Sequence, residues 1–164
     1  MATDHSMLGT LLRQLLERLD RDVENAYRER GLDFRPRYTS IVRLLIEREP
    51  LRVGEIVAQT RVSQPSISAT LAAMQRDGLI TSSKGEDARA RVIKLTSKAR
   101  AMIPALQEQW RITAAAADSL NRDLGFDLEQ LASSALGQLD RVSFHDRMDG
   151  AQSPRGLRGG AVGD

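Results

Sequence analysis

The sequence predicts a mainly α-helical fold with a small β-hairpin, an α+β winged helix set between long terminal helices. Three observations support this fold class. Leucines recur every three to four residues near the N-terminus, which is the spacing of an amphipathic helix. Two short helical segments joined by a tight turn occupy the middle of the chain, and two strand-like segments follow them directly. A long helical pattern then fills most of the C-terminal third.

The composition is that of an ordinary globular protein. The chain has 164 residues, of which 41% are hydrophobic and 28% charged, enough to bury one sizeable core. It contains no cysteine, so disulfides and thiolate metal sites are excluded. No apolar run is long enough to span a bilayer, and the N-terminus lacks the basic-then-apolar pattern of a secretion signal. We therefore expect a cytoplasmic protein.

Charge is distributed unevenly along the chain. Residues 61–100 contain eight lysines and arginines against three acids, whereas residues 101–148 contain four arginines against seven acids. The net charge of the whole chain is only +2. A basic segment beside an acidic one favours a surface that faces a polyanion, carried on a neutral or acidic scaffold.

The first helix is predicted over about residues 7–30. Its apolar stripe is too long to be buried against so small a core, so part of it is expected to meet another chain. Pro36 breaks the chain after this helix, and Thr39 or Ser40 is well placed to cap a short buried helix. That helix ends before Pro50, because the residue preceding a proline is disfavoured in helical geometry.

The most informative stretch is LRVGEIVAQTRVSQPSISATLAAMQRDGLI, residues 51–80. A helix of about two turns and a short turn precede a second helix, for which Ser63 is the expected N-cap and Gly78 the expected end. This is the helix-turn-helix plan. A recognition helix must approach base edges closely, and short polar side chains can donate or accept hydrogen bonds there. Five residues of the second helix are the predicted DNA contacts: Gln64, Pro65, Ser66, Ser68 and Thr70.

The segments LITSS and ARVIKLT are predicted strands, joined by KGEDA into a hairpin. Ile93 and Leu95 point to one face of this hairpin and Val92 to the other. Arg91 shares the parity of the apolar positions, which the pattern does not explain. It is expected either to contact a phosphate or to reach back along the hairpin. The further predicted phosphate contacts are Arg52, Arg61 and Lys84.

The C-terminal region is predicted to be helical. One long helix starts at Ser97 and is broken at GFD, and Asp127 is placed to cap a last helix that runs to about Phe144. Residues 149–164 are rich in glycine, proline and serine and are predicted to be a disordered tail.

In its order of elements and in one local pattern the chain resembles the MarR family of bacterial transcriptional regulators. The wing of that family reads Asp-x-Arg, five residues, then Leu-Thr. Here the same spacing is formed by Asp87, Arg89, the segment ARVIK and Leu95-Thr96. SQPSIS…L…MQRDGLI, over residues 63–80, is also similar to the family's recognition helix and its exit. The resemblance covers about residues 7–147, and the specific motif lies within residues 53–96.

The resemblance implies a homodimer that binds double-stranded DNA. It implies a single MarR-like domain over residues 1–148, with a winged helix-turn-helix at about 38–96. Helices at about 7–30 and 97–147 would form the dimerisation base. Arg89 at the tip of the wing would enter the minor groove, where a guanidinium is attracted by the negative potential, and Asp87 would orient it.

Two positions depart from common patterns. The family often has a basic residue after the serine of the recognition helix, whereas Ser68 is followed here by Ala69. Arg61 occupies a turn position at which many helix-turn-helix proteins have glycine. It is a predicted phosphate contact that would compensate for the missing basic residue.

Three residues are candidates for an effector site: Arg37, Tyr38 and Trp110. MarR-family proteins accept small aromatic or lipophilic, often anionic, ligands in a crevice beside the DNA-binding lobe. The two aromatic rings would then form apolar walls and Arg37 would supply a cation. The alternative is that these rings simply pack in the core.

The sequence therefore predicts a sequence-specific DNA-binding transcriptional regulator, a repressor relieved by a small aromatic or lipophilic ligand. It is not expected to be an enzyme, because no catalytic dyad, phosphate loop or cofactor motif is present. No metal is expected either, since His5 and His145 are far apart and have no ligand spacing around them. For the same reason a metal-sensing winged helix is disfavoured. The alternative reading is a winged-helix protein-interaction module without specific DNA binding.

Overall fold

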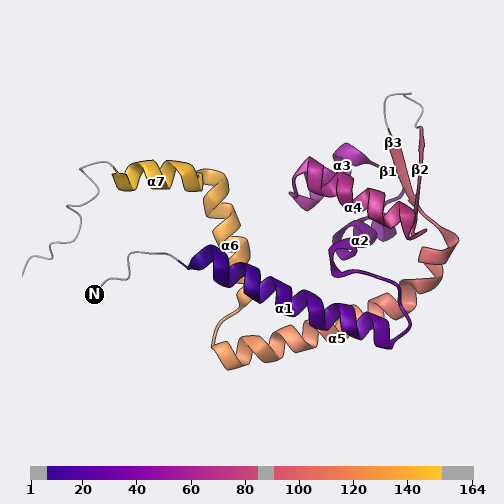
Figure 1. Ribbon diagram of the computed structural model, residues 1–164, viewed down its shortest axis with the longest axis horizontal. Coiled ribbons are helices and arrows are strands. Elements are labelled where there is room, and N and C mark those ends of the chain that lie inside the picture. Colours follow the sequence, from indigo (N-terminus) through magenta and orange to yellow (C-terminus); the bar gives the residue numbers. More distant parts are fainter. Residues whose placement is uncertain (1–6, 85–90, 153–164) are drawn as a thin grey trace, which may run out of the picture. The chain divides into compact units, whose positions relative to one another are not determined.

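The computed structural model describes residues 7–84 and 91–152 and confirms the predicted fold class. Eight helices, one of them a short 3-10 turn, and three strands follow one another along this part of the chain (Figure 1). In order they are α1 (Leu8–Glu29), η1 (Pro36–Tyr38), α2 (Thr39–Glu47), β1 (Leu51–Arg52), α3 (Val53–Thr60), α4 (Gln64–Arg76), β2 (Ile80–Lys84), β3 (Arg91–Leu95), α5 (Ser97–Leu124), α6 (Leu128–Arg141) and α7 (Phe144–Gln152).

The chain divides into two compact units, with the boundary inside α5 after Thr113. The first unit contains α1 to β3 and the beginning of α5. The second contains the rest of α5 together with α6 and α7. The winged helix lies wholly within the first unit.

The three strands form one small antiparallel sheet in the order β1-β3-β2. The predicted hairpin is present as β2 and β3, in a register that places Ser82 opposite Ile93. The sequence did not predict β1, which pairs Leu51 with Ile93 on the other edge of β3. A strand of two residues carries no readable periodicity, so only its pairing reveals it.

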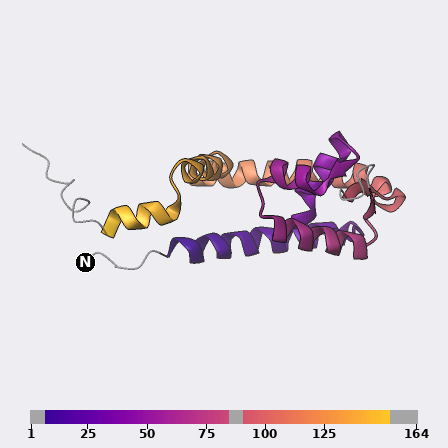
Figure 2. The ribbon, with the colours of Figure 1, turned by 90° about the horizontal axis from the view of Figure 1, so that it is seen from above.

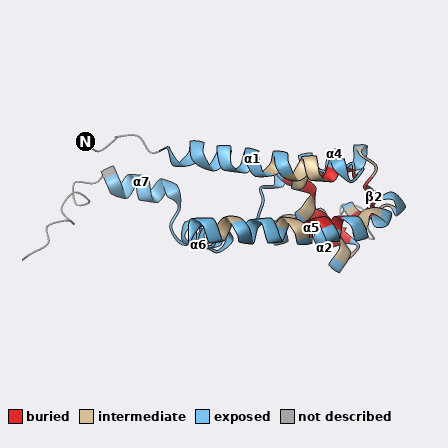
Figure 3. Ribbon diagram, turned by 90° about the horizontal axis from the view of Figure 1, so that it is seen from below, coloured by how far each residue is buried: buried red, intermediate tan, exposed pale blue. Residues whose placement is uncertain are grey.

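One hydrophobic core holds the first unit together. Tyr27 at the end of α1 contacts the connection before α2, and Trp110 donates a hydrogen bond from Nε1 to the Tyr27 hydroxyl at 2.9 Å. Phe34 lies between these rings, 5.1 Å from Tyr27 and 6.5 Å from Trp110 between ring centres. Figure 3 shows the buried residues gathered on α2, α4, the strands and the adjoining part of α5. The further core residues come from α2, the helix-turn-helix, the sheet, the residue before β2 and the first half of α5: Ile41, Leu45, Leu51, Ile56, Ile67, Leu71, Met74, Leu79, Ile80, Ile93, Leu95 and Leu106.

The N-terminal half of α1 extends away from this core. Figures 1 and 2 show it projecting beyond α2, α3 and α4. The predicted leucine stripe is present, but most of it is exposed, and Leu12 retains 56% of its accessible surface. A row of exposed leucines on one helix is the pattern of a surface that packs against another protein. The members of the row are Leu8, Leu11, Leu12, Leu15, Leu16 and Leu19.

The start of α2 differs from the sequence prediction. Neither Thr39 nor Ser40 caps the helix; the cap position is Tyr38, and no side chain bonds there. The preceding 3-10 turn at Pro36–Tyr38 leads the backbone directly into the helix, so the first turn is reached without a side-chain cap.

The second unit confirms one predicted cap and corrects one boundary. Asp127 caps α6 by accepting a hydrogen bond from the Gln130 backbone N–H at 3.0 Å. The tail predicted over residues 149–164 does not start at Asp149, because residues 149–152 belong to α7. Ser143 begins this helix: its hydroxyl accepts the Asp146 N–H at 3.1 Å and donates to the Asp146 carboxylate at 2.6 Å. The remainder of the predicted tail lies outside the described residues.

No helix in residues 7–84 and 91–152 combines the length and apolar character that crossing a bilayer requires.

Candidate nucleic-acid interface

The helix-turn-helix consists of α3, a three-residue turn and α4. The turn is formed by residues 61–63, and Arg61 has a left-handed backbone with φ of 55°. This backbone conformation is one that glycine adopts without strain, as the sequence predicted for this turn position. An arginine adopts it at a steric cost. Thr60 closes the end of α3 by donating its hydroxyl to the Ile56 carbonyl at 2.8 Å. The exposed Arg61 side chain therefore starts from a fixed position at the junction of the two helices.

The helix α4 has one buried and one exposed face, as predicted. Ile67, Leu71 and Met74 are buried in the core. Ser63 is the N-cap residue, although its hydroxyl bonds to Ser66 Oγ at 2.9 Å and not to a backbone N–H. The four N-terminal candidate contacts, Gln64, Pro65, Ser66 and Ser68, are exposed together on the outer face.

Thr70 is less available than the other candidates on α4. It is half-buried, and its hydroxyl donates to the Ser66 carbonyl at 2.9 Å. The only proton of the hydroxyl is thus used within the helix, and Thr70 can offer an incoming base its methyl group and an acceptor oxygen. The polar side chains of α4 that are free to bind another molecule therefore lie mainly on its first turn and a half.

On one face of β3 the side chains change from the buried Leu95 and Ile93 at the base of the hairpin to the exposed Arg91 at its outer end. From the base of the hairpin to its outer end, the cross-strand pairs are Ile80 with Leu95, Ser82 with Ile93 and Lys84 with Arg91. The parity of Arg91 is therefore that of the buried residues, but it lies at the far end of the strand, where it is exposed. This accounts for the position that the sequence pattern left unexplained.

Two of the predicted wing residues, Asp87 and Arg89, lie outside the described residues. Lys84 is placed by its backbone as the last residue of β2. The roles assigned to these three residues remain predictions.

A groove of about 720 Å³ opens between α4, the beginning of α3 and the face of the wing. Gln64 and Ser68 line it from α4, and Arg91 lines it from β3. Arg52 lies at its other edge, paired across the sheet with Val92, the neighbour of Arg91. Four of the sequence-predicted contacts are thus brought to one surface hollow.

Nine of the thirteen residues that line this groove are not among the predicted contacts, and Gly54, Glu55, Gln75 and Ser82 are the small or polar ones that α3, α4 and β2 contribute. Glu55 accepts the Arg52 backbone N–H at Oε2, 2.6 Å away, and so caps the start of α3. Ser82 Oγ is buried and has no hydrogen-bond partner among the described residues. A signal existed for Ser82, because it shares strand parity with the buried Ile80. The helical spacing places Gln75 on the polar face of α4, whereas Gly54 carries no comparable signal in a single sequence.

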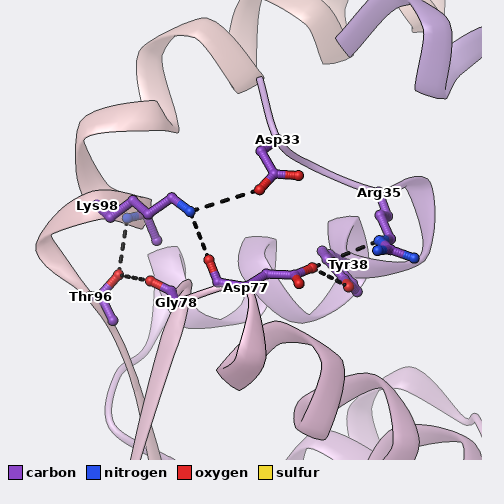
Figure 4. A network of polar contacts seen from close by, with 8 residues as sticks. Asp33, Arg35, Tyr38, Asp77, Gly78, Thr96 and Lys98 are labelled. Atoms are coloured by element: carbon purple, nitrogen blue, oxygen red, sulfur yellow. Dashed lines mark hydrogen bonds and ion pairs between the residues drawn. The ribbon is translucent and has the colours of Figure 1, made fainter. Parts of the chain in front are cut away.

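A network of polar contacts holds the C-terminal end of α4 (Figure 4). The Asp77 carboxylate accepts a hydrogen bond from the Tyr38 hydroxyl at 2.7 Å and lies 3.7 Å from Arg35 Nε. The Asp77 carbonyl accepts a bond from Lys98 Nζ at 2.7 Å, and the next carbonyl, of Gly78, accepts the Thr96 hydroxyl at 2.7 Å. Burial and then the bond to Asp77 raise the pKa of the Tyr38 phenol above its ordinary value. The network ties α4 to the connection after α1 and to the start of α5.

The three candidate effector residues have different environments. Tyr38 is completely buried, and Trp110 is 8% exposed with its indole N–H bonded to Tyr27. Arg37 is exposed, with its guanidinium carbon 5.5 Å from the centre of the Tyr38 ring. A different cation, Arg43, lies over the Trp110 ring at 4.7 Å. In this conformation the two rings therefore pack in the core, which is the alternative that the sequence left open, and their role as ligand walls remains a prediction.

Within the described ranges no cluster of three or more histidine, aspartate or glutamate side chains is arranged to hold a metal ion.

The segment around the helix-turn-helix is similar to a known protein family. Residues 32–90 match the sequence model of the MarR family. None of the curated protein sequences compared with the chain matches it.

Solved structures of transcriptional regulators share the fold. The M. tuberculosis regulator MOSR, in complex with DNA, is 26% identical over 77% of this chain and 96% of its own, with a TM-score of 0.58. The repressor CouR, bound to a 23-mer DNA duplex, is 22% identical over 84% of this chain and 99% of its own, with a TM-score of 0.59.

A third similar structure is NadR in complex with 4-hydroxyphenylacetate. It is 21% identical over 87% of this chain and 99% of its own, with a TM-score of 0.55. The family match covers the polar face of α4, the part of the groove that α3, α4 and β2 line, and the segment carrying Asp87 and Arg89. Residues 32–90, which contain the helix-turn-helix and the first strand of the wing, are therefore similar to the MarR family of transcriptional regulators.

Proposed function

We propose that the protein is a transcriptional regulator that binds a specific double-stranded DNA site as a homodimer. The observation that carries the proposal is the exposed polar face at the beginning of α4, set in a segment that matches the MarR family. Gln64, Ser66 and Ser68 are short enough to approach base edges, and they carry both donors and acceptors. These residues would enter the major groove, and Thr70 would contribute its methyl group.

The proposed dimer gives the DNA site its symmetry. The exposed leucines of α1 supply one apolar surface that a second copy would cover. Two winged helices related by a two-fold axis address half-sites about one helical turn apart, roughly 10 base pairs from centre to centre. We therefore expect a pseudo-palindromic operator.

The wing would extend the contact into the adjacent minor groove. This part of the proposal rests on the spacing of Asp87, Arg89 and Leu95-Thr96. Arg89 would insert into a narrow minor groove, and Asp87 would hold the direction of its guanidinium.

The direct test is a DNA-binding measurement by fluorescence anisotropy. Duplexes from the region upstream of the protein's own coding sequence are compared with scrambled duplexes at several salt concentrations. We expect Gln64→Ala to weaken binding to the specific duplex and to reduce the preference over the scrambled one. Gln107→Ala, on an exposed position of α5, is the matched control and should leave both affinities unchanged.

The salt series separates the two classes of function. Affinity for a duplex that falls steeply with salt concentration indicates phosphate contacts, because these release condensed counterions. A protein that binds specific and scrambled duplexes equally weakly would contradict the proposal and favour the protein-interaction module.

We further propose that the regulator is a cytoplasmic, non-enzymatic repressor released by a small aromatic or lipophilic anion. The resemblance to the MarR family supports this, as does the likeness in fold to NadR, which was solved with 4-hydroxyphenylacetate. Trp110 is the only tryptophan of the chain and therefore reports on its surroundings without labelling. Titration with 4-hydroxyphenylacetate should change its fluorescence and weaken DNA binding over the same concentration range. Unchanged DNA affinity at saturating ligand would contradict this regulation.

A further inference from the structure

A second hollow, of about 310 Å³, lies beside the end of α1 and the connection to η1. This volume is at the lower end of the range for small-molecule pockets, which suits a ligand no larger than an amino acid. The hollow combines apolar side chains, from Leu32 and Phe34, with two acids and two arginines. Its charged lining residues are Glu24, Arg28, Asp33 and Arg35.

The turn after α1 forms this hollow from residues that are close in the chain. Gly31 has a left-handed backbone with φ of 70°, a conformation that glycine adopts without strain. The Leu32 N–H then donates to the Tyr27 carbonyl at 2.9 Å, so the chain folds back at the end of the helix. The exposed charges of the connection are thereby brought to the same hollow as those of the last two turns of α1.

Two of the charged groups at the hollow form only long ion pairs with the rest of the protein. Arg35 Nε lies 3.7 Å from the Asp77 carboxylate, and Asp33 lies 3.9 Å from Lys98 Nζ. Both distances exceed the value of about 2.7–2.9 Å that is typical of a charge-assisted hydrogen bond. A ligand carboxylate bonded to Arg35 and a ligand ammonium bonded to Asp33 would therefore replace two weak pairs with stronger ones.

We infer that this hollow is an effector site for a small zwitterion of the amino-acid type with an apolar side chain. The ligand carboxylate would bind Arg28 and Arg35, because a guanidinium offers it paired donors. The ligand ammonium would bind Glu24 and Asp33, and the apolar side chain would contact Phe34. Both the site and the charge of this ligand differ from those of the aromatic anion considered above.

Two contacts connect the hollow to the recognition helix (Figure 4). Arg35 approaches the Asp77 carboxylate directly, and Asp33 approaches Lys98, whose Nζ donates to the Asp77 carbonyl at 2.7 Å. A ligand that draws Arg35 and Asp33 into the hollow would weaken both contacts at the end of α4. DNA affinity would then fall, and by linkage DNA would weaken binding of the ligand by the same factor. This effect on DNA rests on the proposed function, whereas the site itself does not.

Binding to the hollow is measured without DNA, by isothermal titration calorimetry on the full chain. The probe is L-leucine, compared with 4-methylpentanoate, which lacks its ammonium group, and with 3-methylbutylamine, which lacks its carboxylate. We expect leucine to bind and each analogue to bind at least about tenfold more weakly, because each leaves one pair of charged groups at the hollow unmatched. No binding of leucine, or equal binding of all three compounds, would overturn the inference.

An arginine variant assigns the binding to this hollow. Arg28→Ala removes one guanidinium from the lining and should weaken leucine binding about tenfold. Arg21→Ala removes an exposed arginine of the same helix outside the hollow and is the matched control, which should leave leucine affinity unchanged. Wild-type leucine affinity in Arg28→Ala would place the ligand elsewhere and overturn the inference.

The connection to α4 is measured as the ratio of DNA affinities without and with saturating leucine. We expect a ratio of about 5 for the specific duplex in the wild-type protein. Asp77→Asn keeps an acceptor for the Tyr38 hydroxyl but removes the charge that Arg35 approaches. This variant should still bind leucine, while the ratio falls toward 1. A ratio that stays at the wild-type value would contradict transmission through Arg35 and Asp77.

The outcomes distinguish this inference from the proposed function. If calorimetry shows leucine binding while the wild-type protein shows no salt-dependent DNA binding, the proposed function fails and the site stands. If the protein binds its specific duplex but leucine does not bind, the effector site is overturned and the proposed function stands.

Discussion

Asp77 is the residue whose contacts fix the C-terminal end of α4. Its carboxylate binds Tyr38 and approaches Arg35, and its backbone carbonyl binds Lys98. The partners come from the connection after α1 and from the beginning of α5. A displacement of either segment is therefore transmitted to the end of α4 through short polar contacts. Neither the sequence pattern nor the charge distribution indicates this, because the partners Tyr38 and Asp77 are 39 residues apart.

The hydrogen bond between Tyr38 and Asp77 can be removed by Tyr38→Phe. We expect a loss of about 1–2 kcal/mol in the free energy of unfolding, because Asp77 loses its closest donor. Urea denaturation at neutral pH measures this loss. Tyr27→Phe, which removes the hydroxyl that accepts the Trp110 N–H, is the matched control away from α4. Only Tyr38→Phe should also weaken DNA binding; an equal effect of both variants would contradict a positioning role.

The raised pKa of Tyr38 makes the stability difference between the wild type and Tyr38→Phe depend on pH. A phenol with a raised pKa in the folded state stabilises the protein fully below its unfolded pKa, about 10. That contribution is lost as pH rises through the folded pKa. The gap between wild type and Tyr38→Phe should therefore be constant from neutral pH to about pH 10 and should shrink above it.

The wing arginine is tested by Arg89→Ala. We expect a loss of about 1–3 kcal/mol in binding to the specific site, with the unfolding transition unchanged. Lys94→Ala is the control, because Lys94 is exposed on β3 with the parity opposite to the groove face. A specific affinity that survives Arg89→Ala would remove the wing contact from the proposed mechanism.

Among the helices and strands, the sequence predicts those that carry a regular residue spacing or a local end signal, and it misses those that depend on pairing with a distant segment. The leucine spacing of α1, the cap at Asp127 and the left-handed glycine at Gly78 all leave local signals, and the structure confirms them. The paired strand β1 has two residues, too few for a period, and forms only because β3 is beside it. Tertiary pairing of this kind is absent from any local window of sequence.

The candidate site was predictable to a similar extent. The polar face of α4 is encoded by helical periodicity, so the sequence alone predicts its residues. The groove is formed by three segments that are separated along the chain, so no local window of sequence shows that Gly54 lines the same hollow as Gln64 and Arg91. Arg91 was predictable only in part. The sequence shows that it alternates in step with Ile93 and Leu95, but not that its place at the outer end of β3 leaves it exposed.

The short helix α7 was missed because its apolar pattern is weak, and its formation depends on its cap. Ser143 and Asp146 bond reciprocally at the first turn. Ser143→Ala should destabilise this turn by about 1 kcal/mol. Hydrogen exchange of the backbone amides in residues 144–152 should accelerate about fivefold, while exchange in α4 stays unchanged. The same protection in both proteins would show that the cap does not hold the helix.

At the scale of the whole molecule, the exposed leucines of α1 determine the expected assembly. The core of the first unit is complete without them, so they are not needed to fold one chain. Their burial by a second copy would remove a large apolar surface from water, which favours association. The mass of one chain is 18.1 kDa, and the wild-type protein should sediment at about twice this value.

Leu12→Glu tests the dimer by placing a charge in the middle of the leucine row. We expect a monomer in sedimentation, because a buried unpaired carboxylate opposes association. Operator affinity should fall, because one half-site alone is then bound. Arg13→Glu changes the charge at the neighbouring exposed position and is the control. A wild-type protein that sediments as a monomer would contradict the homodimer.

In the proposed dimer, the projecting half of α1 would also make DNA occupancy depend on the concentration of the protein. If free chains predominate and two must join before the operator is filled, occupancy at low levels varies with the square of the chain concentration. Halving the amount of protein would then lower occupancy about fourfold. Dilution of the regulator during cell growth would by itself release a regulated gene, without any ligand.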